Sequence, residues 1–548
     1  MAHDLVIRGG TIVDGTGAPG RTGDVAIDGD RLTQVGGKAG AGKREIDAAG
    51  LAVSPGFIDP HTHYDAQVCW DRALTPSCWN GVTSVVMGNC GFTLAPCAPA
   101  GRDRIMRMLE RVEGMSLAAL QEGITWDWVS FPEYLDAIER MRPSLNVGAM
   151  IGHSAVRYFV LDEAATEREA TGEEIARMRT LVDEAMRAGA LGFSTSQAPT
   201  HFGGDGKPVP SRVASDAEVL ELAGALAGYG RGMVEITTKH LIDVSVSIAA
   251  ARRSGRPVTF LGAIRPDGWE AVAKARAEGL KLIPQTSCRP TLTDFRLVGM
   301  GIFDQLPSWR RVMQAASPAE LPAVFRDPEF RAAFRDDVTG EFEGYRMFKG
   351  DWDGVKILLV ETPALQDRIG KTVAEIAAER GADPFDVFFD IALEDHLRTE
   401  FSYCLSSDLP RRPTLLDENY LIGLSDAGAH LTLLADHAYA TYFLGRWIRE
   451  RGLMSLEEGV RKLTQVPALL FGIPERGVLG DGNFADVVLF DASRIIDRKT
   501  ELVYDLPGGG PRLLTQADGI EAVLVNGAVT VERGELTGAQ AGQVLRGA

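Results

Sequence analysis

The sequence lacks the cysteine pattern of a disulfide-stabilised protein. Its six cysteines are scattered through 548 residues without a Cys-x-x-Cys pair, which is too sparse for a disulfide framework. It also lacks a basic and apolar leader after Met1, and no apolar run approaches the roughly 20 residues that span a bilayer. We therefore expect a soluble, cytoplasmic protein with no membrane partner. In that compartment a cysteine beside other ligand-type residues is a metal ligand or a nucleophile.

Clustered positive charge is also missing. The net charge is −18 and the pI is about 5.1, and no run of lysines and arginines resembles a phosphate-binding stripe. Nucleic acid is therefore excluded as the expected partner. Hydrophobic residues make up 45% of the chain and charged residues 24%, which is ordinary globular composition with enough length for a large core.

The two ends of the chain share one pattern, and the middle has another. Residues 1–54 alternate in short strand-like runs joined by Gly and Asp turns, and residues 476–548 return to that pattern, which predicts one small β domain made from both ends. Residues 55–475 alternate short apolar runs with helical patterns, which predicts an α/β fold, a (β/α)8 TIM-type barrel. The stretch 291–350 breaks this rhythm, and we interpret it as a helical lid insertion.

Two histidines end the first apolar run of the middle region. His61 and His63 are two positions apart, so on a strand both point to the same side and can reach one zinc-type cation. The alternative is a pair of surface or capping histidines. The preceding Pro-Gly-Phe-Ile-Asp run favours the metal site, because it places both histidines where a barrel strand ends.

Two further strand ends carry ligand-type side chains. Cys90 follows a β-branched run in a Gly-Asn-Cys-Gly turn, and its alternative role is that of a buried structural thiol. Asp426 follows the apolar run 420–424, where it could bind the metal and take a proton from water that the metal has acidified. Its alternative role is to cap the next helix.

The chain resembles the amidohydrolase superfamily and, within it, the D-aminoacylase (N-acyl-D-amino-acid deacylase) branch. The resemblance extends over nearly the whole chain, and its motifs occur in the family's order. They are Pro-Gly-Phe-Ile-Asp-Pro-His-Thr-His-Tyr-Asp at 55–65, Gly-Val-Thr-Ser-Val-Val-Met-Gly-Asn-Cys-Gly at 81–91, Gly-His-Ser-Ala-Val-Arg at 152–157, Gly-Ala-Leu-Gly-Phe-Ser-Thr at 189–195, Ser-Asp-Ala-Gly at 425–428 and Gly-Val-Leu-Gly-Asp-Gly-Asn-Phe-Ala-Asp-Val-Val-Leu-Phe-Asp at 477–491.

The resemblance implies a barrel beside a β-sandwich built from both termini, with zinc at the barrel mouth. His61 and His63 match the metal ligands of the first strand. Cys90 matches the cysteine that replaces a carboxylated lysine of related hydrolases, and Asp426 matches the aspartate that acts as ligand and general acid/base. The implied reaction is hydrolysis of an amide C–N bond in a small-molecule substrate, an N-acyl amino acid or a related, even cyclic, amide.

The sequence departs from the family at two further metal ligands. Relatives supply one histidine from the strand matching 232–240 and another from the strand matching 257–264, but His240 comes a few residues late and Leu261 and Gly262 occupy the second place. We therefore expect one tightly bound Zn²⁺ and a weak or absent second ion. If two ions bind, the replacement ligands to consider are Glu235, Lys239 and His240.

The family's substrate-binding lysine and tyrosine are also replaced, by Arg265 and by the segment 285–289. His153, Arg157 and Arg289 are the candidates for substrate contacts, each with a structural role as its alternative. Two other functions stay open: a lactone or carbamate hydrolase using the same site, and a non-catalytic barrel. A homo-oligomer also stays open.

Overall fold

The computed structural model provides the fold. It describes residues 2–239, 243–261, 266–298, 302–315, 317–341 and 346–547. Within these ranges no helix is long and apolar enough to cross a membrane.

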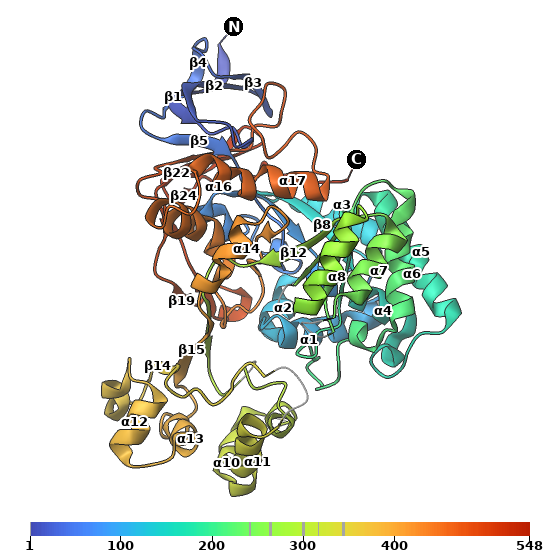
Figure 1. The fold of residues 1–548 in the computed structure, drawn as a ribbon, viewed down its shortest axis with the longest axis vertical. Coiled ribbons are helices and arrows are strands. Elements are labelled where there is room, and N and C mark those ends of the chain that lie inside the picture. The colour runs from blue at the N-terminus through green and yellow to red at the C-terminus, as the bar shows by residue number, and fades with distance from the viewer. Residues whose placement is uncertain are drawn as a thin grey trace.

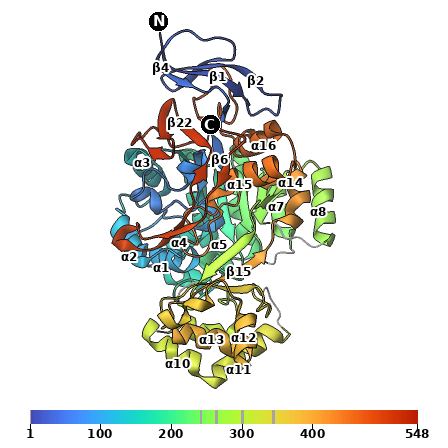
Figure 2. The same cartoon turned by 90° about the vertical axis from the view of Figure 1, so that its left-hand side faces the viewer.

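A curled sheet of eight parallel strands forms the centre of the molecule (Figures 1 and 2). Thr62, just after the first strand, forms a parallel bridge with Ala427, just after the last, and His63 N donates to Ala427 O over 2.7 Å. The two edges therefore meet at the carboxyl ends of the strands, which is consistent with a TIM-type barrel. The strands in chain order are β6 (Phe57–Asp59), β7 (Val82–Met87), β8 (Asn146–Gly152), β9 (Gly192–Ser196), β10 (Met233–Thr237), β11 (Val258–Leu261), β12 (Leu282–Thr286) and β16 (Leu421–Ile422).

Helices cover the outside of this sheet, as Figure 1 shows for α5 to α8. Their ends follow from the sequence: α5 starts at a capping box between Thr171 and Glu174 and ends at Gly189, whose φ of 106° is the left-handed conformation that glycine favours. The helices are α1 (Arg102–Val112), α2 (Leu117–Gly123), α3 (Phe131–Met141), α4 (His153–Leu161), α5 (Gly172–Ala188), α6 (Asp216–Gly224), α7 (Ser245–Ser254), α8 (Pro266–Ala277), α14 (Arg412–Leu416), α15 (Tyr439–Tyr442), α16 (Leu456–Leu463) and α17 (Gln465–Phe471).

Both ends of the chain share a second, nine-stranded sheet. Its junction is the antiparallel pair β5 and β17, in which Val53 lies opposite Leu489. Beyond it the last residues run along the amino-terminal end of β8, where Leu545 N donates to Val147 O over 2.8 Å. The strands are β1 (His3–Ile12), β2 (Arg21–Asp28), β3 (Arg31–Val35), β4 (Gly42–Asp47), β5 (Ala52–Pro55), β17 (Val487–Phe490), β22 (Ile520–Val525), β23 (Ala528–Glu532) and β24 (Glu535–Leu536).

One segment between β12 and β16 forms a unit of its own, which we call the insertion (residues 291–406). It extends well past residue 350, where the sequence pattern placed its end, because its sheet has the order β13-β15-β14 and closes only with β15. Thr291 is the register partner of Ser406, so the chain leaves and returns at one point. Its elements are β13 (Thr291–Phe295), α9 (Arg310–Met313), α10 (Leu321–Arg326), α11 (Pro328–Thr339), β14 (Val355–Leu359), α12 (Val373–Arg380), α13 (Pro384–Glu394) and β15 (Glu400–Ser406).

The insertion has a separate hydrophobic core that is unusually aromatic. Phe388 lies at its centre, with ring centroids 4.7 Å from Phe401 and 5.1 Å from Trp352. In Figures 1 and 2 its helices project away from the barrel as a distinct lobe. The lobe contacts the barrel through an ion pair of 2.7 Å between Arg111 and Asp304.

Candidate metal centre and active site

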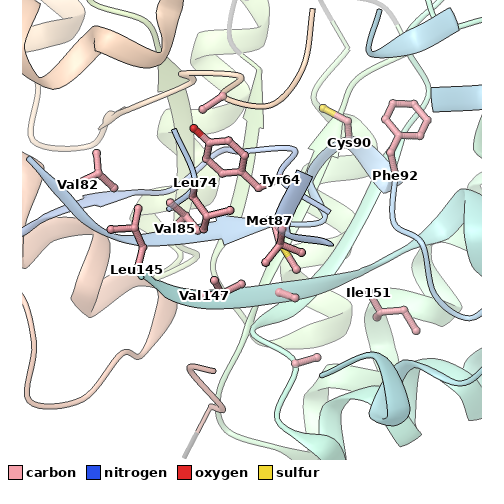
Figure 3. Packing of buried hydrophobic residues seen from close by; sticks show 14 of the residues in the cluster. Tyr64, Leu74, Val82, Val85, Met87, Cys90, Phe92, Leu145, Val147 and Ile151 are labelled. Carbon is pink, nitrogen blue, oxygen red and sulfur yellow. The ribbon is translucent and has the colours of Figure 1, made fainter. Parts of the chain in front are cut away.

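Cys90 lies just beyond the carboxyl end of β7, next to the aliphatic core (Figure 3). Its φ of 54° is rare for a residue other than glycine, and Gly88 and Gly91 on either side also have positive φ. The turn is held by β10, three strands away in the sheet order, because Cys90 N donates to Glu235 Oε2 over 2.8 Å and Thr237 Oγ1 donates to the Cys90 sulfur over 3.2 Å. Such a fixed, strained turn is typical of a functional site.

The residues after β6 bring two imidazoles to this thiol. One ligand atom each from His61, His63 and Cys90 lies within 4.8 Å of the others, and His61 Nε2 is 3.5 Å from the Cys90 sulfur. All three residues are buried. Imidazole nitrogen and thiolate sulfur are the donors that zinc prefers, so this donor set fits a zinc-type cation.

Asp426 completes the cluster from the other edge of the sheet. Its Oδ1 is 3.2 Å from His61 Nε2 and 3.7 Å from His63 Nε2. The preceding Ser425 is fixed against β6, since its hydroxyl donates to Asp59 Oδ2 over 2.6 Å. The Asp426 side chain retains 19% of its exposure, so its carboxylate is accessible from the mouth of the barrel.

The second nitrogen of each imidazole faces an oxygen. His61 Nδ1 is 2.9 Å from Gln285 Oε1, and His63 Nδ1 is 3.3 Å from Glu113 Oε1. Both rings therefore turn Nε2 toward Asp426 and the centre of the cluster. Outer partners of this kind fix the orientation of metal-binding histidines.

The electrostatics of the cluster suit a bound cation. Burial raises the pKa of the Cys90 thiol well above its usual value, and the negative Glu235 raises it further. Burial also raises the pKa of Glu235 to about 7 and lowers that of His63 to about 4. Burial also tends to raise the pKa of Asp426. Hydrogen bonds to His61 and His63 outweigh this effect and hold its pKa well below the usual range. Burial thus disfavours the charged forms of Cys90, Glu235 and His63, and a bound cation would instead favour the thiolate and the carboxylate.

A small cavity lies between the barrel and the insertion. Its volume is about 120 Å³. His430, in the turn that follows Asp426, lines one side of it, and Arg111 from the end of α1 lines another. Asp304 and Gln305 of the insertion contribute a third wall, so the cavity is shared by the barrel and the insertion.

Comparison with known proteins identifies the family. The model of the amidohydrolase family matches residues 44–531. The D-aminoacylase of Alcaligenes xylosoxydans xylosoxydans is 30% identical over 99% of this chain and 97% of its own. The N-acyl-D-glutamate deacylase of the same organism is 30% identical over 96% and 93%. The chain belongs to the amidohydrolase family.

Solved structures place it in the D-aminoacylase branch. A D-aminoacylase whose binuclear centre shows one-metal activation and second-metal attenuation is 28% identical, with a TM-score of 0.68 over 99% of both chains. The N-acyl-D-glutamate deacylase of Bordetella bronchiseptica, in complex with zinc and a phosphonate mimic of the tetrahedral intermediate, is 26% identical, with a TM-score of 0.68 over 100% of both chains. This protein is a metal-dependent amidohydrolase of that branch.

The three predicted substrate contacts of this amidohydrolase lie in scaffold networks. Both ring nitrogens of His153 are occupied, by Thr195 Oγ1 at 2.8 Å and Glu218 Oε1 at 2.9 Å. Arg157, fully buried, donates to both oxygens of the same Glu218. Arg289 pairs with Asp497 at 2.5 Å and with Asp436 at 3.4 Å. Each of these three side chains thus has partners within the chain, whereas the predicted ligands His61, His63, Cys90 and Asp426 lie together.

Sequence reasoning assigned no role to two residues that lie beside the predicted metal ligands. Glu113 follows a helix rather than a strand, so no barrel-strand pattern pointed to it. Gln285 does lie in a strand, β12, where its place near a strand end was a usable signal. Of the replacement ligands considered for a second ion, Glu235 contacts the Cys90 turn, and His240 lies outside the described residues.

Proposed function

We propose that this amidohydrolase cleaves the C–N bond of an N-acyl amino acid or a related small amide, with Asp426 as the general acid and base. The observation that carries the proposal is the position of the Asp426 carboxylate. It contacts both imidazoles and remains partly exposed, whereas Glu113 and Glu235 are almost completely buried. Asp426 is thus the acidic group of the cluster that a substrate can approach.

His61, His63, Cys90 and Asp426 would hold one zinc-type ion, because ligand atoms of the two imidazoles and the thiol lie within 4.8 Å of one another and the Asp426 carboxylate lies beside both imidazoles. When bound, such an ion supplies Lewis-acid activation of water and of the amide carbonyl. A single well-occupied ion follows from the two histidines that the chain lacks. A second metal ion would bind weakly unless Glu235 acts as a ligand.

Asp426 then moves the protons of the reaction. Its carboxylate accepts a proton from the attacking water, whose oxygen bonds to the carbonyl carbon. As the C–N bond breaks, the carboxyl group returns that proton to the departing nitrogen, which leaves a carboxylic acid and an amine. The low pKa of Asp426 keeps the group ionised and ready to accept a proton before each turnover.

The cavity between barrel and insertion is the proposed substrate site. Arg111 brings a permanent positive charge to it, and in this structure that charge is paired with Asp304 at 2.7 Å. A substrate carboxylate can replace the Asp304 carboxylate on the same guanidinium, since Arg binds carboxylates through a planar fork. The insertion would thereby act as a lid over the site. The roles first considered for His153, Arg157 and Arg289 remain predictions.

The function is tested with a substrate panel on zinc-loaded protein. N-acyl-D-amino acids are assayed beside their L-isomers, cyclic imides, lactones and carbamates, with release of amine or acid as the signal. Turnover of the amides that disappears in Asp426→Asn supports the proposal. Turnover of lactones or carbamates alone would favour the second candidate, a hydrolase that uses the same water, metal and aspartate on another carbonyl.

A further inference from the structure

Glu113 is a buried acidic residue whose only described ion pair is with a metal-ligand candidate. The residue is 1% exposed and directly follows the last turn of α1. Its Oε1 is 3.3 Å from His63 Nδ1. Among the described residues both atoms are buried without a hydrogen-bond partner, so the contact of 3.3 Å between them is the interaction available to both.

Burying a carboxyl group in this position is costly unless it interacts with something. A protein that used it only to fill space would do better with an apolar side chain or an amide. Here the carboxyl oxygen lies beside the ring nitrogen of His63 that faces away from the cluster, while Nε2 of the same ring faces Asp426 at 3.7 Å. The ring thus lies between an inner acceptor and an outer acceptor.

We propose that Glu113 is the positioning residue of this metal centre. Its carboxylate accepts the proton on His63 Nδ1, which fixes the tautomer, holds Nε2 toward the cation and makes that nitrogen a stronger donor. The inference rests on the proposed metal site and adds a residue that does not itself contact the ion or the substrate.

The two histidines differ in their outer partners. His61 is held by the neutral amide of Gln285 at 2.9 Å, whereas His63 faces a carboxyl group. Only the carboxylate can add negative charge to the imidazole, so His63 is the ligand whose strength depends on its outer partner. Removing that charge should therefore weaken the binding of the ion without destabilising the fold.

The test compares Glu113→Gln with a matched control, Glu110→Gln. Gln keeps the size and the oxygen of Glu113 but removes its charge, and Glu110 lies on the same helix outside the cluster. The readouts are the zinc dissociation constant from competition with a chelator and the absorption spectrum of the Co²⁺-substituted protein. We expect E113Q to bind zinc about 10- to 100-fold more weakly with an altered Co²⁺ spectrum, and E110Q to match the wild type.

Glu113→Asp keeps the charge and provides a second variant if E113Q does not fold. It should bind zinc more tightly than E113Q or, in its absence, more tightly than Glu113→Ala. Zinc affinity equal to wild type in E113Q, or no advantage of E113D over the uncharged variant, overturns the inference. If the wild type itself bound no zinc, the proposed metal site would fail instead. A wild type that binds zinc but turns over no amide would reject the proposed reaction alone.

Discussion

The barrel mouth and the insertion bury opposite kinds of side chain. At the mouth, acidic groups and histidines are buried around a strained cysteine turn, an arrangement that costs stability unless a cation compensates for it. The insertion instead buries stacked and edge-on aromatic rings, with Phe388 at their centre. The buried charged groups at the barrel mouth are therefore expected to depend on a bound cation for their stability, whereas the insertion is stabilised by aromatic packing.

The strongest test of this division is Asp426→Asn. Turnover of any amide substrate should fall about 10²- to 10⁴-fold, because the amide oxygen can still bind metal but cannot accept a proton. Zinc content by elemental analysis should stay near that of the wild type. The exposed Asp205→Asn serves as the control and should leave both values unchanged. Near-native kcat in D426N would require another general base.

Excision of the insertion gives the next largest effect. Joining Thr291 to Ser406 through a short Gly-Ser linker removes the lobe cleanly, because these two residues are register partners. All four proposed ligands remain, so zinc should still bind. The cavity loses its Asp304 wall, and kcat/KM should fall by about 10²-fold, as expected when substrate positioning is lost. Full activity in the excised protein would refute a lid function.

The sequence predicted the ligand-bearing strands better than the boundaries of the insertion. The ligand-bearing strands were recognisable, because each combines a short apolar run with a ligand-type side chain at its carboxyl end. The end of the insertion was not, since β15 pairs with β13 on one side and β14 on the other, and the pairing with β13 is far from local. Glu113 was missed for the same reason, because its partner His63 lies far from it in the sequence.

The roles of arginine residues were also hard to predict from the sequence. Arg157 and Arg289 follow apolar runs near the family motifs, which made them reasonable anion-binding candidates. In the structure Arg157 pairs with the buried Glu218, and Arg289 pairs with Asp497. Arg111, on an ordinary amphipathic helix, lines the cavity instead. Whether an arginine serves the scaffold or the cavity depends on its tertiary partner, which no local pattern reports.

Phe388→Ala should destabilise the insertion by about 3–5 kcal/mol, the cost of removing a large ring from a packed core. Zinc affinity should change little, because the aromatic core and the metal ligands are separate clusters. Limited proteolysis within residues 291–406, together with zinc titration, measures the two effects. Leu409→Ala, at a position 63% exposed, is the control. A parallel loss of zinc affinity in F388A would show that the two regions fold as one.

Arg111→Met should raise KM for N-acyl amino acids about 10- to 100-fold, the loss expected for a hydrogen bond to a charged group. The matching carboxyl-free amides should be affected much less. Arg107→Met, one turn earlier on α1 and paired with Asp103, is the control. Equal effects of R111M on charged and uncharged substrates would argue against carboxylate recognition.

Asp304→Asn should give the smallest effect and the opposite sign. Arg111 would lose its competing carboxylate, so KM for a carboxylate substrate should fall a few-fold while zinc affinity stays constant. An increase in KM would mean that Asp304 positions Arg111 for the substrate rather than competing with it. Steady-state kinetics of D304N beside R111M separates these two roles.

The meeting of the first and last strands of the barrel has a consequence for synthesis of the chain, given the proposed role of Asp426. A hydrogen bond joins Ser425 to Asp59, and these two residues are 366 positions apart in the chain. A nascent chain therefore carries His61, His63 and Cys90 long before the ribosome has made Asp426. Such a fragment would carry three of the proposed zinc ligands but would lack the proposed general base. If Asp426 is the base, activity requires the last strand, which also brings Ala427 to its bridge with Thr62 at the edge of the first.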